Sequence, residues 1–261
     1  MRTRSVVALS VLTLSALALA GCSGTGGEKP NADDSALCAA AAPSGKGSES
    51  IKVEGKTGEP SKATFSKPLE IKTLERTVLV EGSGDAITED RLVSYALSAF
   101  NAESGDELGT VGYGDGLLLP SQIAPESALG QVLGCATVGS RIVATFPSSV
   151  DAPGEVYIMD VLDTVPSAAW GEPQDPKAGM PTVTLGKDGA PTVAIPDAPA
   201  PDAIEISVLK KGDGPAVKPN DTTLLQYYGV DWATGESFDS SWSRGAPYSN
   251  PGNNYVPGFV Q

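Results

Sequence analysis

Residues 101–108, Asn-Ala-Glu-Ser-Gly-Asp-Glu-Leu, align without gaps with residues 231–238, Asp-Trp-Ala-Thr-Gly-Glu-Ser-Phe, when the chain is shifted by 130 residues, from 101 to 231. The same shift places residues 78–87 over residues 208–217. Similarity within one chain at a fixed spacing indicates an internal repeat. Both copies are predicted to form a strand, a Gly-x-Gly turn, a long strand, a polar turn containing glycine, and another strand.

The long strand of the first copy is ambiguous from its own residues. Residues 92–100 could form a helix, because a capping-type start precedes them at residues 88–90. The second copy decides the matter, since residues 222–230 are rich in β-branched and aromatic side chains, which favour strands. The sequence therefore predicts two tandem β-rich domains of the α+β class, with mostly antiparallel strands.

The second copy carries a family resemblance. Its segments Leu225-Gln-Tyr-Tyr-Gly229, Gly235-Glu-Ser-Phe-Asp-Ser-Ser241 and Arg244-Gly-Ala-Pro-Tyr248 resemble, in order and spacing, the FKBP-type peptidyl-prolyl cis-trans isomerases. Residues 255–259, Tyr-Val-Pro-Gly-Phe, are similar to the family's entry into its central helix. The resemblance implies a bent antiparallel sheet wrapped on one short helix, with an X-Pro substrate in the apolar groove between them.

The same resemblance implies the site residues. By carry-over, the catalytic positions are Tyr227, Phe238, Asp239 and Phe259, and the substrate-binding positions are Arg244, Tyr248, Tyr255 and Val256. The aromatic and aliphatic members would form the walls and floor of the groove. Asp239 would accept a hydrogen bond from Tyr227 or pair with Arg244. Phe259 stands where the family usually has tryptophan, which keeps an apolar floor but loses an indole donor.

The chemistry of such a site suits a chain that has no histidine. A Ser-His-Asp triad, a Cys-His pair and a histidine zinc site are all excluded. Rotation of an X-Pro amide instead requires that its partial double-bond character be overcome, a barrier of about 18–20 kcal/mol, with no covalent bond broken. We therefore expect neither a cofactor nor a metal.

The first copy, assigned to residues 51–168, departs from the family at the decisive positions. The shift places Leu97, Leu108, Gly109 and Gly114 where the second copy has Tyr227, Phe238, Asp239 and Arg244. Its later part follows the family: residues 128–143 resemble the helix and the following strand, and residues 156–162 the closing strand. A degenerate FKBP-like domain without a working pocket is expected, to hold substrate or to support the second domain.

Residues 169–202, between the copies, are rich in proline and glycine. Within them, residues 182–185 and 192–195 alternate in polarity around a glycine-containing turn, which predicts a β-hairpin. The alternative is an extended linker with polyproline II character.

The N-terminus indicates export. Arg2 and Arg4 precede an apolar run that ends at Leu-Ala-Gly-Cys22, which predicts a signal peptide over residues 1–21. The ending also resembles the lipobox of bacterial lipoproteins, which implies lipidation of Cys22 and anchoring to the outer face of the cytoplasmic membrane. Residues 22–50 have one large apolar side chain, Leu37, and are predicted to form a flexible stalk.

Cys38 and Cys135 remain in the exported chain. Disulfides persist outside the cytoplasm, so the two either form a bridge or remain unpaired thiols. The formal net charge of −14 makes binding to nucleic acid phosphates improbable. A monomer is expected.

Residues 203–261 correspond to the N-terminal half of the second domain, because the family's helix would begin where the sequence stops. We expect a fragment of a prolyl isomerase that assists the folding of exported proteins by binding their X-Pro segments. The competing hypothesis is a surface lipoprotein that acts as a chaperone or binding module on an FKBP-like fold without isomerase activity.

Overall fold

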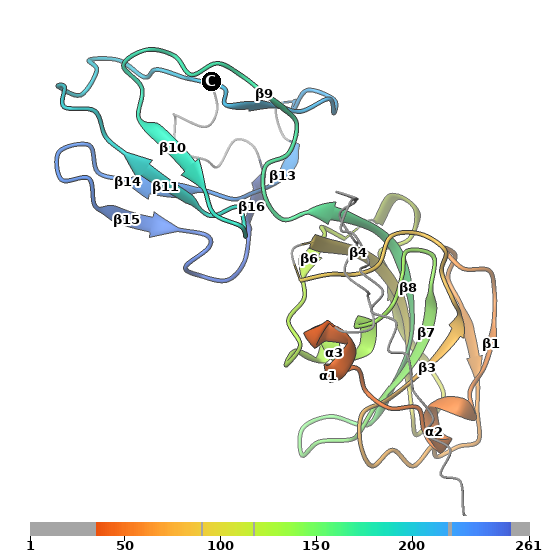
Figure 1. The fold of residues 1–261 in the computed structure, drawn as a ribbon. Helices are drawn as coiled ribbons and strands as arrows, with labels where there is room; N and C mark the ends of the chain where they lie inside the picture. The colour runs from red at the N-terminus through yellow and green to blue at the C-terminus, as the bar shows by residue number, and fades with distance from the viewer. Residues whose placement is uncertain (1–34, 90, 117, 219–220, 252–261) are drawn as a thin grey trace, which may run out of the picture. The chain divides into compact units, whose positions relative to one another are not determined.

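The computed structural model describes residues 35–89, 91–116, 118–218 and 221–251. It is built mainly from antiparallel strands with a few short helices (Figure 1), so the predicted fold class is confirmed. The signal peptide, Cys22, Tyr255, Val256 and Phe259 lie outside the described residues. Residues 35–166 and residues 167–251 are described separately below, as the N-terminal and C-terminal regions.

The N-terminal region contains one antiparallel sheet. Its strand order is β3 (Glu75–Val80), β7 (Arg141–Phe146), β8 (Glu155–Pro166), β4 (Arg91–Asn101) and β5 (Glu107–Val111), and β6 (Ser121–Gln122) also pairs with β4 (Figure 1). A short 3-10 helix, η2 (Gly114–Gly116), follows β5. The strand predicted over residues 92–100 is therefore confirmed, and it extends along most of β8.

Both faces of this sheet are buried, because successive side chains of a strand point to opposite faces. On one face, Val93, Ala144 and Met159 pack with Val132 and Leu133 of α3 (Ala128–Leu133). On the other, the sheet packs against the segment that contains β1 (Lys52–Glu54) and β2 (Lys62–Thr64). A strand expected at residues 69–71 is not formed, although Leu69 and Ile71 pack against the same core.

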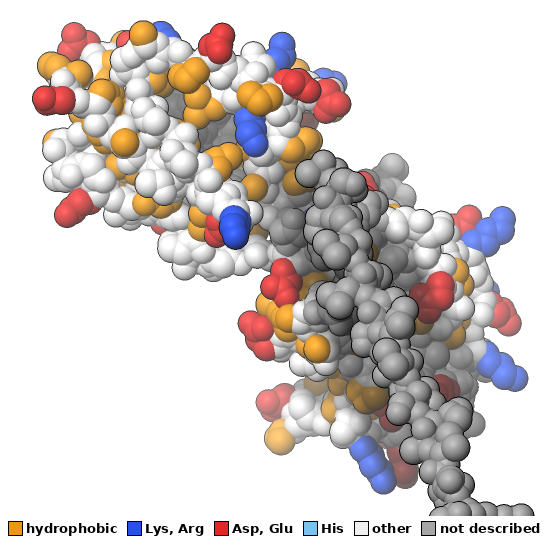
Figure 2. Space-filling model, in the orientation of Figure 1, with side chains coloured by type: hydrophobic (Ala, Val, Ile, Leu, Met, Phe, Trp, Pro, Cys, Tyr) orange, Lys and Arg blue, Asp and Glu red, His pale blue; other side chains and the backbone are white. Residues whose placement is uncertain are grey.

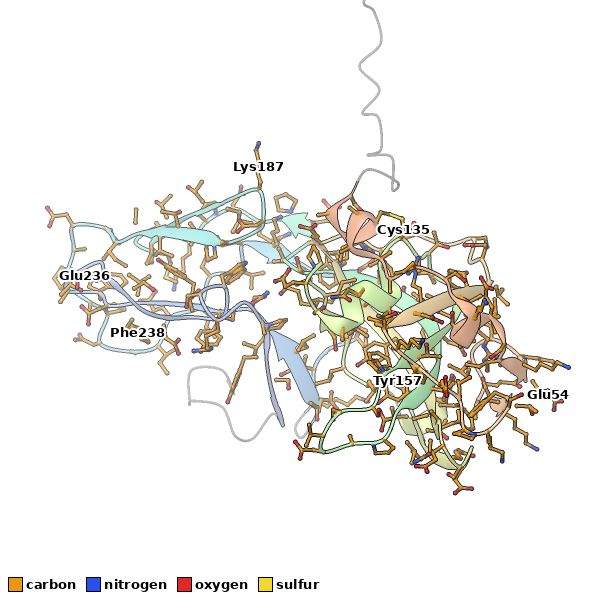
Figure 3. The ribbon with its side chains drawn as sticks, turned by 90° about the horizontal axis from the view of Figure 1, so that it is seen from below. Glu54, Cys135, Tyr157, Lys187, Glu236 and Phe238 are labelled. Carbon is orange, nitrogen blue, oxygen red and sulfur yellow. A yellow bond between two sulfur atoms is a disulfide. The ribbon has the colours of Figure 1, made fainter. Side chains whose placement is uncertain are left out.

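The prediction of a flexible stalk is wrong for residues 35–50. They form α1 (Ala36–Ala40) and α2 (Lys46–Glu49), and Leu37 is fully buried in the core. Ser35 caps α1 by accepting a hydrogen bond from the Cys38 N–H. A disulfide joins Cys38 to Cys135, with 4.4 Å between their Cα atoms, and Cys135 is labelled in Figure 3. One buried leucine and one covalent link thus order a segment that has little apolar surface of its own.

The internal repeat is visible in the backbone. The strand pair β4–β5 corresponds to the pair β14 (Tyr228–Val230) and β15 (Ser237–Ser240). Ser98 pairs with Thr110 in the first copy, and Tyr228 pairs with Ser240 in the second, each position shifted by 130. Both ladders have an irregularity at the same place, after Ala99 and after Gly229. The alignment made from sequence therefore has the correct register.

The other strands of the C-terminal region form three short antiparallel pairs. These are β10 (Thr182–Leu185) with β11 (Pro191–Ala194), β9 (Glu172–Pro173) with β12 (Lys210–Lys211), and β13 (Thr222–Leu225) with β16 (Tyr248–Pro251). The first pair confirms the predicted hairpin in preference to an extended linker. The strand expected over residues 222–230 is interrupted at Gln226 and Tyr227.

Acidic side chains are scattered over the face of the molecule shown in Figure 2, as the negative net charge requires. Within the described part of the chain, no helix has the length and apolar character needed to cross a membrane.

Candidate functional site

Tyr227 lies in the interruption between β13 and β14. Its N–H donates to the Ser241 hydroxyl over 2.9 Å, and its carbonyl accepts from the Ser241 N–H over 3.0 Å. The Ser241 hydroxyl also donates to the Gln226 side-chain oxygen. Because a serine side chain replaces one bond of the regular ladder, the backbone leaves the strand path at Tyr227. The break therefore places the Tyr227 ring beside the end of β15.

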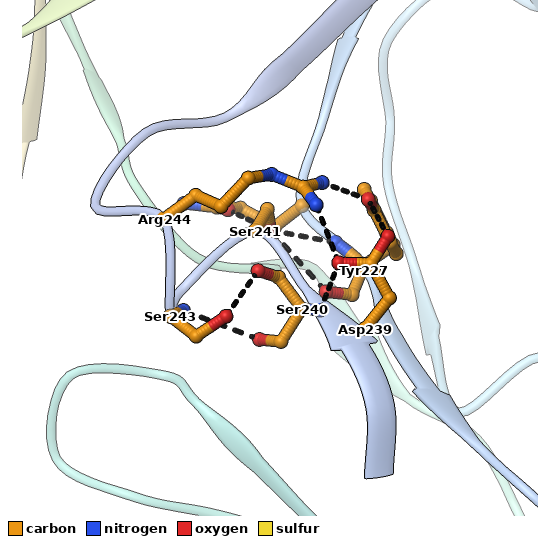
Figure 4. A network of polar contacts seen from close by, with 7 residues as sticks. Tyr227, Asp239, Ser240, Ser241, Ser243 and Arg244 are labelled. Carbon is orange, nitrogen blue, oxygen red and sulfur yellow. Dashed lines mark hydrogen bonds and ion pairs between the residues drawn. The ribbon is translucent and has the colours of Figure 1, made fainter.

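Three side chains converge beside this ring (Figure 4). The Tyr227 hydroxyl donates to Asp239 Oδ2 over 2.7 Å. The Arg244 guanidinium donates to Asp239 Oδ1 and to the Tyr227 hydroxyl, and its Cζ lies 5.1 Å from the centroid of the Tyr227 ring. The sequence offered a Tyr227–Asp239 bond and an Asp239–Arg244 pair as alternatives, and the structure contains both.

A tight turn after β15 carries Arg244 back toward Asp239. The Arg244 N–H donates to the Ser241 carbonyl over 3.2 Å, and Gly245 has a φ of +70°, a conformation that favours glycine. Ser243 Oγ donates to the Ser240 carbonyl over 2.7 Å. Ser240 and Ser241 are both buried. The sequence argument quoted these serines as part of a motif but assigned them no role; their hydroxyls hold the turn that positions Arg244.

Tyr248 completes an aromatic corner. It lies in β16, where it pairs with Leu225, two residues before Tyr227. The centroids of the Tyr227 and Tyr248 rings are 6.0 Å apart, and the rings are nearly perpendicular at 81°. Edge-to-face packing of this kind is favourable for aromatic rings. Tyr248 remains 38% exposed, so the corner offers apolar surface to a ligand.

Phe238 is not part of this cluster. Its side chain is 74% exposed (Figure 3), and its ring lies over Gly229, so closely that a Cβ at Gly229 would be 2.5 Å from it. The structure therefore gives Phe238 no role in the aromatic corner formed by Tyr227 and Tyr248. The predicted positions Tyr255, Val256 and Phe259 lie outside the described residues.

The ion pair by itself stabilises the site little. The Arg244 and Asp239 side chains are 47% and 41% exposed, and a solvated pair contributes about 0–1 kcal/mol. Its value is geometric, because two acceptors and a ring face fix one orientation of the guanidinium. The described residues contain no group of three or more cysteine or carboxylate ligands that could hold a metal ion.

Two curated proteins are similar in sequence to this chain, although no protein-family model matches it. A probable FK506-binding protein from Corynebacterium glutamicum is 39% identical over 71 residues, which cover 27% of this chain and 60% of that protein. An FK506-binding protein from Streptomyces anulatus is 40% identical over 57 residues, 22% of this chain and 46% of that protein. The chain is a relative of the FKBP family. It spans about half the length of these curated relatives.

Solved FKBP structures are weakly similar. The chain has a TM-score of 0.30 and 19% identity with FkpA from Escherichia coli, over 37% of this chain and 52% of that one. For a putative prolyl isomerase, FKBP12 from Mycobacterium tuberculosis, the values are 0.29 and 15%, over 35% and 84%. Scores this low carry no argument about function.

The FKBP-like positions of the first copy lack this network. Leu97, Gly109 and Gly114 stand at the places of Tyr227, Asp239 and Arg244, so the hydroxyl, the carboxylate and the guanidinium are all missing. Leu108 is 50% exposed, in agreement with the exposed position of Phe238. Within residues 95–114, the repeat has kept the backbone register and lost the polar side chains.

Proposed function

We propose that the protein is an FKBP-type peptidyl-prolyl isomerase of exported polypeptides, with its site around Tyr227, Asp239, Arg244 and Tyr248. The observation that carries the proposal is the bonded cluster of Tyr227, Asp239 and Arg244 beside the Tyr248 ring. The identity with two FK506-binding proteins supports it.

The corner suits the reaction physically. The Tyr227 and Tyr248 rings give a proline ring an apolar wall, and such surroundings favour a twisted amide, whose charge separation is smaller than that of the planar one. Asp239 and Arg244 hold the Tyr227 ring in one orientation, so the wall is formed before substrate binds. A guanidinium has five N–H donors, more than the two that this cluster uses, and another can stabilise the rotated carbonyl.

The test is a prolyl-peptide isomerisation assay on the full-length gene product. Asp239→Asn removes the charge that orients both partners and should lower kcat/KM by roughly tenfold or more. Tyr227→Phe keeps the ring and removes the hydroxyl, and should cost less. Asp213→Asn removes an exposed carboxylate outside the cluster and should leave the rate unchanged.

A rate at background in the wild-type protein would refute the isomerase proposal. Equal rates in the wild-type and Asp239→Asn proteins would refute the assigned site. Far-UV circular dichroism of each variant separates loss of the site from loss of the fold.

We also propose that the protein acts outside the cytoplasm, anchored through Cys22. The Cys38–Cys135 disulfide supports export, because disulfides persist in oxidising compartments. A lipid anchor would hold the isomerase where newly exported chains emerge.

A further inference from the structure

The N-terminal region has an apolar hollow of about 230 Å³ on the sheet face that α3 covers. The first turn of α3 forms one side of it through Leu129, and β4, β7 and β8 form the rest through Tyr95, Leu97, Phe146, Tyr157 and Met159. Tyr95, Leu97, Phe146 and Tyr157 are only partly buried although they pack against the core. The hollow is therefore an opening in the core surface, which neither α3 nor the eight-residue connection between β7 and β8 closes.

The walls of the hollow present carbon. The Phe146 and Tyr157 rings pack with centroids 5.0 Å apart. The Tyr157 hydroxyl donates to the Glu155 carboxylate, and burial, followed by this hydrogen bond, raises the pKa of Tyr157 to about 12. The phenol thus stays protonated with its proton directed to Glu155. A ligand of the hollow would be recognised by apolar contact.

The volume selects the size of the ligand. An apolar cavity of about 150 Å³ takes up benzene, whereas drug-sized ligands occupy pockets of about 300–1,000 Å³. A hollow of 230 Å³ fits between these limits. It can hold one large side chain but is small for a macrocyclic or drug-sized compound.

The repeat gives this hollow a different chemistry from the C-terminal cluster. Leu97, which lines it, stands at the position of Tyr227, and glycines replace Asp239 and Arg244. A bound segment would therefore meet apolar contacts without the carboxylate and guanidinium that orient the other site.

We infer that the hollow binds a single leucine or phenylalanine side chain of an unfolded polypeptide and holds it without isomerising it. This inference replaces the expectation that the first copy lacks a pocket. It does not depend on isomerase activity, because its residues are separate from the Tyr227 cluster.

Methionine-methyl NMR can test the inference in the full chain. The sequence has three methionines, of which Met159 lines the hollow and Met180 does not. The probes are five-residue peptides of glycine and serine with a central leucine, phenylalanine or alanine. The leucine and phenylalanine peptides should shift the Met159 signal with a Kd on the order of 1 mM, since one side chain buries little area. The alanine peptide should not, and Met180 should not move.

Two tryptophan variants control for the site. Ala128 is exposed at the edge of the hollow, so Ala128→Trp should cover it and abolish the Met159 shift. Ala152→Trp adds the same side chain to an exposed turn between β7 and β8 and should keep the shift. Asp239→Asn should also keep it, which separates this site from the isomerase proposal.

Three results would overturn the inference. The Met159 signal may stay in place with every peptide, move equally with the alanine peptide, or move on concentration of the protein alone. The last result would assign the hollow to a second copy of the chain.

Discussion

At the scale of single residues, the strongest polar feature of the N-terminal region is a buried ion pair. Arg141 and Asp160 are 3% and 0% exposed, and two N–H···O contacts of 2.7 Å join them. The Arg141 guanidinium also donates to the carbonyls of Gly55, Lys56 and Glu59. The hydrogen bond to Asp160 raises the pKa of Arg141. The pair therefore fastens the connection between β1 and β2 to the sheet.

Tyr113 closes this cluster. Its hydroxyl donates to Asp160 Oδ2 over 3.1 Å, and burial, followed by the Asp160 charge, raises the pKa of Tyr113 to about 12. The sequence gave no indication of this arrangement, because Tyr113, Arg141 and Asp160 are far apart in the chain and follow no periodic pattern. Only the pairing of β7 with β8 places Arg141 opposite Asp160.

Arg141→Met should destabilise the fold strongly. The substitution leaves the Asp160 carboxylate buried without its cation, and breaking one side of a buried pair costs about 3–5 kcal/mol. Urea denaturation measures the loss. The double variant Arg141→Met, Asp160→Leu should recover much of it, since an apolar pair of similar volume needs no counter-ion. A single variant as stable as the wild type would contradict the role given to the pair.

The same contrast explains the outcome at the candidate site. Tyr227, Asp239 and Arg244 could be found from sequence because the FKBP resemblance preserves their order and spacing. Ser241 and Gln226 were missed because their role depends on a break in a strand, and residues 222–230 read as one continuous strand. Phe238 was misjudged because a motif fixes the position of a side chain in the chain and not the face to which it points.

At the scale of elements, the two copies repeat one turn in detail. In the first, the Asn101 side chain accepts from the N–H groups of Glu103 and Ser104. In the second, the Asp231 side chain accepts from Ala233 and Thr234. The turn differs chemically in one respect, because an amide holds the first copy and a carboxylate the second. The alignment predicted the turn, and Asn and Asp are the residues that form it by bonding their own backbone.

This difference predicts a pH response of one turn only. Hydrogen bonds from Thr234, backbone first, lower the pKa of Asp231 below its ordinary value of 3.8. A lowered pKa means that the folded turn favours the ionised form, so its stabilisation is complete above pH 3.8 and is lost as the pH falls through the lowered pKa. NMR amide shifts should show Thr234 titrating in this acid range.

Ser104 and a variant give the controls for that titration. The Ser104 amide, held by a group that does not ionise, should stay unchanged over the same pH range. Asp231→Asn should remove the response of Thr234 and leave the turn formed. A Thr234 response that survives in Asp231→Asn would assign the titration to another group.

The segment before β1 shows where sequence patterns fail. Residues 35–50 were assigned to a stalk because hydropathy registers one large apolar residue there. The structure orders them through polar contacts as well, since Ser48 receives a hydrogen bond from Thr77 and its N–H donates to the Glu75 carboxylate. Such contacts depend on partners in β3 and have no signature within the segment itself.

Cys38→Ser should destabilise the N-terminal region. The disulfide joins residues 97 positions apart, and closing a loop of that length stabilises a fold by about 4–5 kcal/mol in the chain-entropy view. Thermal unfolding with and without a reductant measures the effect. The wild type should melt lower when reduced, whereas the Cys38→Ser protein should melt at the same lower temperature in both conditions. A reductant-insensitive wild type would contradict this account.

At the scale of the whole molecule, the repeat explains which apolar side chains are buried. Leu74 and Val78 pack against the core, since β3 pairs with β7. Their counterparts Ile204 and Val208 are 54% and 53% exposed, and no strand pairs with residues 204–208 among those described. The same strand sequence is thus buried in one copy and exposed in the other, because burial depends on a partner strand and not on the strand itself.

The location of the molecule is its last open property, and Cys22 decides it. If the thiol is acylated, the chains contribute roughly 0.8 kcal/mol per buried CH₂, and two or three of them hold a protein at a membrane. The wild type should then take up labelled palmitate and sediment with membranes, whereas Cys22→Ala should do neither. Cys38→Ser removes a different cysteine and should remain at the membrane. Labelling that persists in Cys22→Ala would place the lipid elsewhere, and a wild type free of lipid would leave the signal peptide as the only export device.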